Sequence, residues 1–415
     1  MKLLVATFVS SVLLFSVYNA RSVAADKLFA DVMFRGDPEE NMNASQLITS
    51  KGYPCEEHTV QTEDGFLLGL QRIPYGKKNA STTNPRPVVF LQHGLLCSST
   101  NWLTNLENES FAYILADAGF DVWLGNVRGN TYSRSHVSLN PNQDEFWEWS
   151  FDQMALYDLP AMVNYALKVS MQPQLYYIGH SQGTLMAFAQ LPRNKELAKK
   201  IKTFFALGPV TTVGHVESPI KYLADLVPEL QLLFKIFGVR DFLPNNEIIN
   251  WLADHVCEKR YQIYCENILF IISGWDPQQL NQTRLPVYFH HVPAGTSVRN
   301  VIHFAQMIKS QKFQMYDYGS AAENLKYYNQ STAPLYYPEN LTTPTALYWG
   351  GQDWLADPKD VQSLIPKIKN VLISNDEIVE FDHLDFIWGM DAPERVYHNI
   401  LNTIQKQEES IFSRG

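Results

Sequence analysis

Short apolar runs alternate with amphipathic stretches along the first half of the chain. The clearest apolar runs, rich in β-branched and aromatic residues, are 88–91, 121–124 and 175–178. Runs of this kind are typical of parallel strands that are buried on both faces. Between them, 111–119 and 151–169 have the spacing of amphipathic helices, with Asp152 as an N-cap-like start of the second helix and Pro173 after its end. This alternation predicts an α/β fold, a mostly parallel sheet with helices on both faces.

The alternation stops between about residues 211 and 337. Helix-like stretches with bulky apolar side chains take its place, and the first pattern returns with a strand-like run at 345–349 and a helix-like stretch at 358–368. Because the pattern returns, an inserted, mainly helical cap explains the interruption better than an ordinary second domain. The predicted division is a signal peptide at 1–25, a core at 26–211, a cap at 212–337 with a lid near 225–245, and the rest of the core at 338–415.

The N-terminus has the features of a secretory signal peptide. Lys2 precedes an apolar run at 3–17, and small residues follow around Ala20 and Ala25, either of which fits as the cleavage site. No comparable apolar stretch occurs elsewhere, so no transmembrane anchor is expected. In the secretory pathway, Asn-x-Ser/Thr sequons on exposed loops are expected to carry glycans. The six sequons are at Asn43, Asn79, Asn108, Asn281, Asn329 and Asn340.

The same compartment permits disulfides among the four cysteines. Cys257 and Cys265 are the favoured pair, because they close a short loop. Eight residues of straight helix would separate their Cα atoms by about 12 Å, so pairing requires a bend between them. Cys55 and Cys97 can be paired or can be two buried thiols.

Composition narrows the function classes. The formal net charge is −10, 13% of the residues are aromatic and 18% are charged. These values exclude a disordered chain, and the acidic balance argues against a nucleic-acid-binding protein. The sequence contains no metal-ligand spacing, phosphate-binding loop or dinucleotide fingerprint, so no metal and no other cofactor is expected.

One turn concentrates the candidate chemistry. The segment Gly179-His180-Ser181-Gln182-Gly183 follows a predicted strand and precedes a helix expected to begin near Thr184. This is the G-x-S-x-G nucleophile elbow in its required context, which makes Ser181 the candidate nucleophile. The turn is so tight that side chains at the flanking positions would collide, which explains Gly179 and Gly183.

The elbow also needs two backbone N–H donors for a developing oxyanion. One is expected from Gln182, at the start of the helix behind Ser181. The other is expected from Leu95, because the strand at 88–92 runs into the loop that contains it. His93, in the same loop, is predicted to hold the loop rather than to act as the base.

The acid must follow Ser181 and precede the catalytic histidine in the chain. Asp353 lies just beyond a predicted strand, at the carboxyl edge of the sheet where ligands gather. Asp357 is the rival, although it can instead cap the helix that opens at Pro358. We therefore predict Asp353.

The base is predicted to be His383, which follows a β-like stretch at 378–381. His398 is the only other histidine beyond Asp353, and it lies in a helical context. In the predicted triad, His383 takes the proton from Ser181 while Asp353 orients the imidazole.

Eight segments, which span nearly the whole chain after the signal peptide, carry a resemblance to a known family: 42–48, 52–54, 62–66, 90–96, 126–133, 179–184, 355–358 and 383–386. They resemble the acid lipase family of α/β-hydrolases, which includes gastric and lysosomal acid lipases. The resemblance implies an α/β-hydrolase core with a helical cap, and hydrolysis of triacylglycerol or sterol esters at acidic pH. It also implies that Ser181, Asp353 and His383 form the triad, with Leu95 and Gln182 as oxyanion donors. The family's cap disulfide has a slightly wider spacing than Cys257–Cys265, and Cys97 is an extra cysteine.

The expected protein is a secreted or lysosomal lipase that acts on neutral lipid esters at an emulsion or membrane surface. A carboxylesterase of smaller esters is one alternative, against which the large apolar cap argues. A non-catalytic lipid-binding or storage protein is another, but it would require an inactive triad. The predicted cap has apolar stretches at 232–234 and 268–272 that can face an acyl chain.

Overall fold

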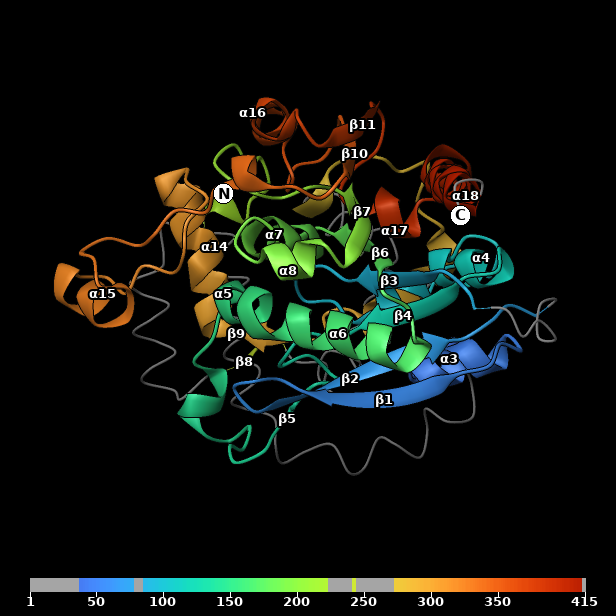
Figure 1. The fold of residues 1–415 in the computed structure, drawn as a ribbon, viewed down its shortest axis with the longest axis horizontal. Coiled ribbons are helices and arrows are strands. Elements are labelled where there is room, and N and C mark those ends of the chain that lie inside the picture. The colour runs from blue at the N-terminus through green and yellow to red at the C-terminus, as the bar shows by residue number, and fades with distance from the viewer. Residues whose placement is uncertain (1–36, 78–84, 223–240, 244–271, 413–415) are drawn as a thin grey trace, which may run out of the picture.

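The computed structural model describes residues 37–77, 85–222, 241–243 and 272–412. In these ranges the chain forms one large sheet with helices on both faces (Figure 1), and one separate pair of short strands. Outside the described residues lie the predicted signal peptide, the sequon at Asn79, the cysteines Cys257 and Cys265, and most of the predicted lid and of the apolar cap stretches.

The large sheet has nine strands and is mostly parallel, as predicted. The order is β1-β2-β4-β3-β6-β7-β10-β11, parallel from β4 to β11, while β1 and β5 pair antiparallel with β2, and β2 pairs antiparallel with β4. The strands are β1 (Glu56–Gln61), β2 (Phe66–Ile73), β3 (Val88–Gln92), β4 (Asp121–Gly125), β5 (Ser135–His136), β6 (Leu175–His180), β7 (Ile201–Leu207), β10 (Thr345–Gly350) and β11 (Leu372–Ile378). The β-like stretch predicted at 378–381 therefore shares only its first residue with β11.

The register brings the carboxyl ends of the central strands to one edge. Gln92 at the end of β3 pairs with Gly125 of β4 and with Gly179 of β6. His180 at the end of β6 pairs with Leu207 at the end of β7. In open parallel sheets, ligand sites collect at this edge. The loops after β3, β6 and β7 therefore begin close together.

Side chains of the central strands alternate between two buried cores. Leu175 and Tyr177 of β6 face one core, and Tyr176 and Ile178 face the other. A strand that is covered on both faces must be apolar at nearly every position, as this one is. The first core includes α6 (Leu159–Ser170), α7 (Gln182–Gln190) and α16 (Pro358–Ile368), and the second includes α3 (Ala44–Ser50), α4 (Phe111–Asp117), α17 (Asp385–Trp388) and α18 (His398–Phe412).

The helix predicted at 151–169 is present but starts differently. It consists of α5 (Phe151–Gln153), a π turn (Met154–Asp158) and α6. The prediction that Asp152 caps it is wrong, because Ser150 is the N-cap and forms a capping box with Gln153. Asp152 stands two residues after the cap, and its carboxylate instead accepts hydrogen bonds from Tyr316 N at 2.8 Å and Tyr336 Oη at 2.5 Å.

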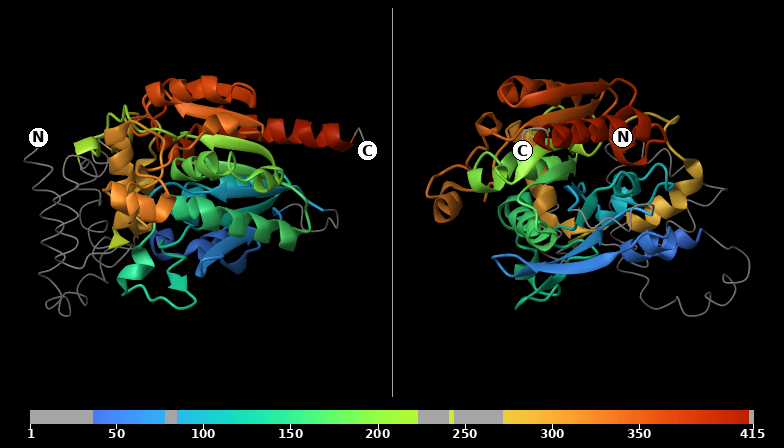
Figure 2. Two further views of the ribbon diagram at one scale, coloured as in Figure 1. Left: turned by 60° about the vertical axis from the view of Figure 1, so that its left-hand side comes forward. Right: turned by 45° about the vertical axis from the view of Figure 1, so that its right-hand side comes forward.

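Between β7 and β10 the described chain consists of helices joined by long loops, with one pair of short strands. Short helices at the end of this region lie beyond one end of the strands, orange in Figure 2. The core pattern then returns with β10 and α16, and the predicted bounds of that helix are confirmed. The elements of the region are α13 (Leu285–His291), α14 (Val298–Ser310), α15 (Ala321–Tyr328) and the antiparallel pair β8 (Asp241–Phe242) and β9 (Thr296–Ser297). The boundaries of the cap at 212–337 stay a prediction.

Candidate active site

Ser181 occupies the sharp turn between β6 and α7. Its backbone has φ 53° and ψ −117°, a conformation that residues with a Cβ rarely adopt. The helix begins at Gln182, slightly before the predicted start near Thr184, so Ser181 itself is the N-cap residue. Ser181 is only partly buried, whereas its neighbours His180 and Gln182 are buried.

Close contacts with the backbone leave no room for a side chain at either flanking glycine. A Cβ at Gly179 would lie 2.8 Å from the carbonyl carbon of Gly183, and one at Gly183 would lie 2.5 Å from the carbonyl oxygen of Gln92. Both clashes are with backbone atoms, which cannot move aside without opening the turn. The turn is also fixed by Ser181 N, which donates to the Leu207 oxygen at 3.0 Å.

A buried hydrogen bond joins Asp353 and His383. His383 Nδ1 lies 2.8 Å from Asp353 Oδ2, and the two side chains are 3% and 0% exposed, respectively. The other carboxylate oxygen accepts hydrogen bonds from Leu355 N at 2.9 Å and Ala356 N at 2.7 Å. Asp353 is thus fixed in position, and a proton held on Nδ1 leaves the lone pair of Nε2 available as a base.

Asp357 and His398, the alternative candidates for the acid and the base, make no hydrogen bond with each other or with the Asp353–His383 pair within the described part of the chain. Asp357 is the N-cap of α16 and accepts a hydrogen bond from Lys359 N at 2.8 Å. His398 is exposed at the first residue of α18. Of the two candidate acids, Asp353 is the one that contacts His383.

Ser181 and His383 are linked indirectly, through the backbone of Leu207 and Gly208. No hydrogen bond joins the Ser181 hydroxyl to His383 among the residues that the structure describes. Such bonds often form fully only when substrate is present. Ser181 N bonds to the Leu207 oxygen, and the next residue, Gly208, lies against His383.

Two residues that sequence reasoning missed hold His383 in place. His180 Nε2 donates to the His383 carbonyl oxygen at 2.9 Å, and the centroids of the two rings are 4.8 Å apart. Burial, together with the nearby His383, holds the pKa of His180 well below its usual range, so this imidazole stays neutral. Gly208 has φ 53°, and a Cβ there would lie 3.2 Å from His383 Nδ1.

The loop after β3 lies against the elbow. A Cβ at Gly94 would be 3.0 Å from Ser181 Cβ. His93 holds this loop, as predicted, because its Nδ1 donates to the Gly94 oxygen at 2.8 Å and its Nε2 accepts from Val127 N at 3.3 Å. Burial lowers the pKa of His93 to about 4. The imidazole therefore keeps both hydrogen bonds in mildly acidic solution.

The predicted oxyanion donors lie on the two segments that meet at Ser181. Gln182 is the first residue of α7, where backbone N–H groups have no acceptor within the helix and the helix dipole is positive. Leu95 follows Gly94, the residue that lies against Ser181. Among the described residues, neither backbone N–H donates a hydrogen bond to the protein itself. Both N–H groups are thus free for a substrate oxygen.

Asn300 of α14 holds the side chain of Gln182. Asn300 Nδ2 donates to Gln182 Oε1 at 2.7 Å and to Thr296 Oγ1 at 3.1 Å. Its Oδ1 accepts from Phe151 N at 2.8 Å, and the residue is fully buried. Sequence reasoning missed Asn300 because it is 118 positions away from Gln182 and carries no local motif.

Two buried carboxylates, Asp382 and Asp385, lie close to His383 in the chain. Asp385 Oδ2 accepts from Asp382 N at 2.6 Å, and Asp382 Oδ2 accepts from Ser273 Oγ at 3.1 Å. Burial and the nearby Asp353 carboxylate raise the pKa of Asp382 to about 6. Burial and the Asp382 charge raise the pKa of Asp385 well above its usual range. The pair therefore binds protons more strongly than free carboxylates do.

The other predicted sites that the structure describes are five sequons and two cysteines. The sequon residues that the structure describes are exposed at Asn43, Asn108, Asn329 and Asn340 and partly exposed at Asn281. Cys55 and Cys97 are both free thiols, and burial raises the pKa of Cys97 to about 12. In the described ranges, no group of three or more His, Cys, Asp or Glu side chains is placed to hold a metal ion, and no helix is long and apolar enough to cross a membrane.

Comparisons with known proteins identify the family of the chain. Residues 44–106 match the family described as a partial α/β-hydrolase lipase region, and residues 87–389 match the α/β hydrolase fold. The chain is 51% identical to human lysosomal acid lipase/cholesteryl ester hydrolase over 373 residues, which covers 90% of this chain and 93% of that protein. It is 52% identical to human gastric triacylglycerol lipase over 376 residues, which covers 90% of this chain and 94% of that protein.

A solved structure supports the fold. A soluble variant of monoglyceride lipase from Saccharomyces cerevisiae, in complex with a substrate analogue, superposes with a TM-score of 0.51 at 16% identity. The match covers 84% of this chain and 94% of that one. At this level of identity the likeness establishes the fold alone.

Proposed function

The chain belongs to the acid lipase family of α/β-hydrolases, and from that premise we propose that it hydrolyses neutral lipid esters with Ser181, His383 and Asp353 as its catalytic triad. One observation carries the proposal. The His383–Asp353 hydrogen bond of 2.8 Å is buried beside a serine held in a strained turn. A buried carboxylate that orients an imidazole next to an activated serine is the arrangement that acyl transfer requires.

In the first half of the reaction Ser181 is the nucleophile. His383 Nε2 takes the hydroxyl proton as Ser181 Oγ attacks the ester carbonyl carbon. The negative charge that develops on the carbonyl oxygen is stabilised by the N–H groups of Leu95 and Gln182. Collapse of the tetrahedral intermediate breaks the bond to the alcohol, which leaves with the proton from His383, and Ser181 keeps the acyl group.

In the second half water replaces the alcohol. His383 takes a proton from water, whose oxygen attacks the acyl carbon in the same oxyanion hole. The fatty acid leaves, and the proton returns to Ser181 Oγ. Asp353 keeps its negative charge throughout and stabilises the imidazolium that forms twice in each turnover.

The proposed substrate class is neutral lipid esters, meaning triacylglycerols, sterol esters or both. The chain is about equally similar to a lysosomal acid lipase/cholesteryl ester hydrolase and to a gastric triacylglycerol lipase, so similarity favours neither. The same relatives support a secreted or lysosomal location. Because such substrates are insoluble, we propose that the enzyme works at the surface of an emulsion or membrane.

Release of fatty acid from emulsified triolein and cholesteryl oleate between pH 4 and 7 tests this function. We expect the wild type to hydrolyse at least one emulsion, and Ser181→Ala to be slower by about 10⁴-fold or more. Ser138→Ala, which changes an exposed serine, is the matched control and should retain full activity. Turnover of a short soluble ester with no release from either emulsion would instead identify a carboxylesterase. Binding without hydrolysis would identify a lipid-binding protein.

A further inference from the structure

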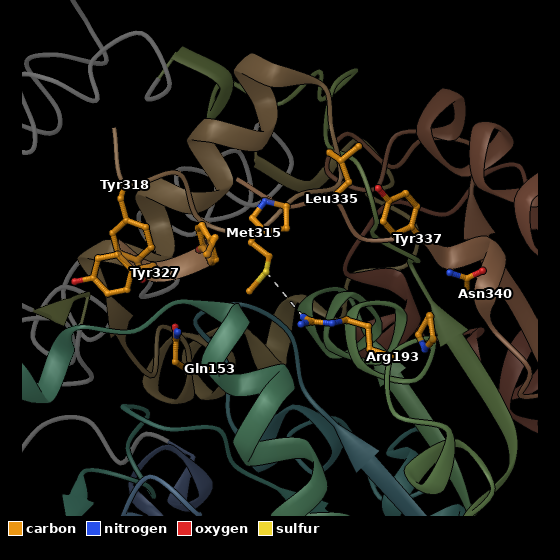
Figure 3. A pocket seen from close by; sticks show the side chains of 11 residues that line it. Gln153, Arg193, Met315, Tyr318, Tyr327, Leu335, Tyr337 and Asn340 are labelled. Carbon is orange, nitrogen blue, oxygen red and sulfur yellow. Dashed lines mark hydrogen bonds between the residues drawn. The ribbon is translucent and has the colours of Figure 1, made fainter. Parts of the chain in front are cut away.

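A cavity of about 530 Å³ is lined by residues that do not include Ser181, Asp353 or His383, and Figure 3 shows its lining. Its wall includes Pro192 and Arg193, which follow the carboxyl end of α7, whereas Ser181 precedes the amino end of that helix. Its volume is in the range of sites for small ligands, which is about 300–1,000 Å³. The catalytic reaction described above does not use this cavity.

Aromatic rings form much of the cavity wall. Tyr318, Tyr327, Tyr328 and Tyr337 line it. The rings of Tyr318 and Tyr327 are stacked with their centroids 3.7 Å apart. Tyr327 is 58% exposed and Tyr337 is 51% exposed. Ring faces that remain this exposed offer apolar area that a ligand can cover.

The polar groups of the cavity suit a neutral ligand that carries hydroxyl groups. Gln153 Oε1 accepts from Ser150 N at 2.9 Å, while its Nε2 has no acceptor among the described residues. Arg193 donates to Met315 Sδ at 3.9 Å and forms no ion pair with any carboxylate in the described part of the chain. Donors beside exposed aromatic faces recognise sugars, because sugar rings present apolar C–H faces and hydroxyl edges.

The edge of the cavity carries a glycan acceptor. Asn340 lines the cavity, is exposed, and begins the sequon Asn340-Leu341-Thr342. Asn340 is the last residue of a short 3-10 turn at Pro338–Asn340, and Asn340 N donates to the Tyr337 oxygen at 3.1 Å. Residues that are three apart in such a turn lie side by side. Tyr337 and Asn340 therefore lie close together in the wall of the cavity (Figure 3).

We propose that Asn340 carries an N-linked glycan whose first sugars occupy this cavity, against Tyr337. Attachment follows the usual chemistry of a sequon, in which a lipid-diphosphate-linked oligosaccharide is the donor. Asn340 Nδ2 forms a bond to the anomeric carbon, the bond from that carbon to the diphosphate breaks, and Nδ2 loses a proton. The glycan then covers exposed tyrosine rings and accepts hydrogen bonds from Gln153 and Arg193. The proposal requires entry into the secretory pathway and does not depend on catalysis.

Mass spectrometry of the protein secreted from eukaryotic cells tests the proposal directly. We expect Asn340 to be glycosylated, and peptide:N-glycosidase to release this glycan from the native protein roughly three- to tenfold more slowly than the glycan at the exposed Asn108. Tyr337→Ser keeps the sequon and removes the aromatic wall, so it should bring the release rate at Asn340 to that at Asn108. An unoccupied Asn340, or a release rate that Tyr337→Ser does not change, would overturn the proposal.

Nitration of tyrosines provides a second measurement that leaves Tyr337 in place. Thr342→Ala removes the sequon but keeps both Asn340 and Tyr337, so nitration of Tyr337 should become several-fold faster than in the wild type. Ser331→Ala removes the neighbouring sequon at Asn329, which does not line the cavity, and should leave Tyr337 protected. Equal nitration in wild type and Thr342→Ala, with protection only when a lipid emulsion is added, would show that the cavity docks on lipid instead.

Discussion

The Asn300 side chain donates a hydrogen bond of 2.7 Å to the side-chain oxygen of Gln182, the residue whose backbone N–H is the proposed oxyanion donor. This contact ties the start of α7 to α14. Asn300→Ala should therefore lower kcat for a soluble ester by about tenfold and leave KM nearly unchanged, since the donor would be misplaced only for the transition state.

A double-mutant cycle separates this role from general destabilisation. Asn300 also accepts from Phe151 N, so its loss leaves a buried donor unpaired and lowers stability whatever residue 182 is. If Asn300 acts through the Gln182 side chain, Asn300→Ala should reduce kcat much less in a Gln182→Ala background. Equal reductions in both backgrounds would assign Asn300 a purely structural role.

Asp353→Asn should lower kcat by about 10⁴-fold, because an amide favours the wrong imidazole tautomer and cannot stabilise the imidazolium. Asp357→Asn is the matched control four positions away. Asparagine also caps helices well, so this variant should keep both its activity and its melting temperature. A larger kcat loss in Asp357→Asn than in Asp353→Asn would instead make Asp357 the acid of the triad.

Gly208→Ala should reduce activity by at least about tenfold, because its Cβ would lie 3.2 Å from His383 Nδ1 and would push the imidazole from its position. Gly319→Ala is the control, since Gly319 also has a positive φ but has no atom within 4 Å of the added Cβ. Each variant should lose about 1–3 kcal/mol of stability from backbone strain. Only Gly208→Ala should lose kcat, and similar kcat values for the two would contradict this placement of His383.

The carboxylate pair beside His383 predicts a pH-dependent stability. The pKa of Asp382 is raised from 3.8 to about 6, so the folded protein binds the proton more tightly than the unfolded chain does. This stabilisation is complete below the unfolded pKa and is lost as the pH rises through the folded pKa, so the group favours acidic conditions. Urea unfolding at several pH values from 4 to 7 should show a decline in unfolding free energy that is smaller in Asp382→Asn.

The exposed carboxylate of Glu339 supplies the control for this series. Glu339→Gln should follow the wild-type dependence on pH. The sign of the change in unfolding free energy with pH distinguishes the two cases, because an ordinary paired carboxylate would make the protein less stable in acid. A wild type that gains stability from pH 4 to 6 relative to Asp382→Asn would show that Asp382 is ionised in the folded state.

Features that depend on neighbours in the chain were accessible from the sequence. Gly179 and Gly183 are needed by the local geometry of one turn, and the strand before it and the helix after it define its context. Asp353 could be preferred over Asp357 because one follows a strand and the other precedes a helix-opening proline. These are local signals, whereas the contact that distinguishes Asp353, its hydrogen bond with His383, appears only in the structure.

Features that depend on distant segments were not accessible. Three residues contact the site across long stretches of chain: Asn300 contacts Gln182, and His180 and Gly208 contact His383. The sequence around each of them does not indicate which distant residue it contacts. The N-cap at Ser150 was missed because Asp152 is also a good capping residue, and only the tertiary contacts with Tyr316 and Tyr336 show why it is used elsewhere.

The central claim is that Ser181 is a nucleophile activated by His383. Incubation with an alkyl p-nitrophenyl phosphonate, followed by peptide mapping by mass spectrometry, measures this directly, because the phosphorus centre mimics the tetrahedral intermediate and stays bonded to the attacking oxygen. We predict one adduct per chain, on Ser181, that does not form in Ser181→Ala and forms at least about 10³-fold more slowly in His383→Ala. An adduct on another residue, or equally fast labelling of Ser181 without His383, would contradict the account.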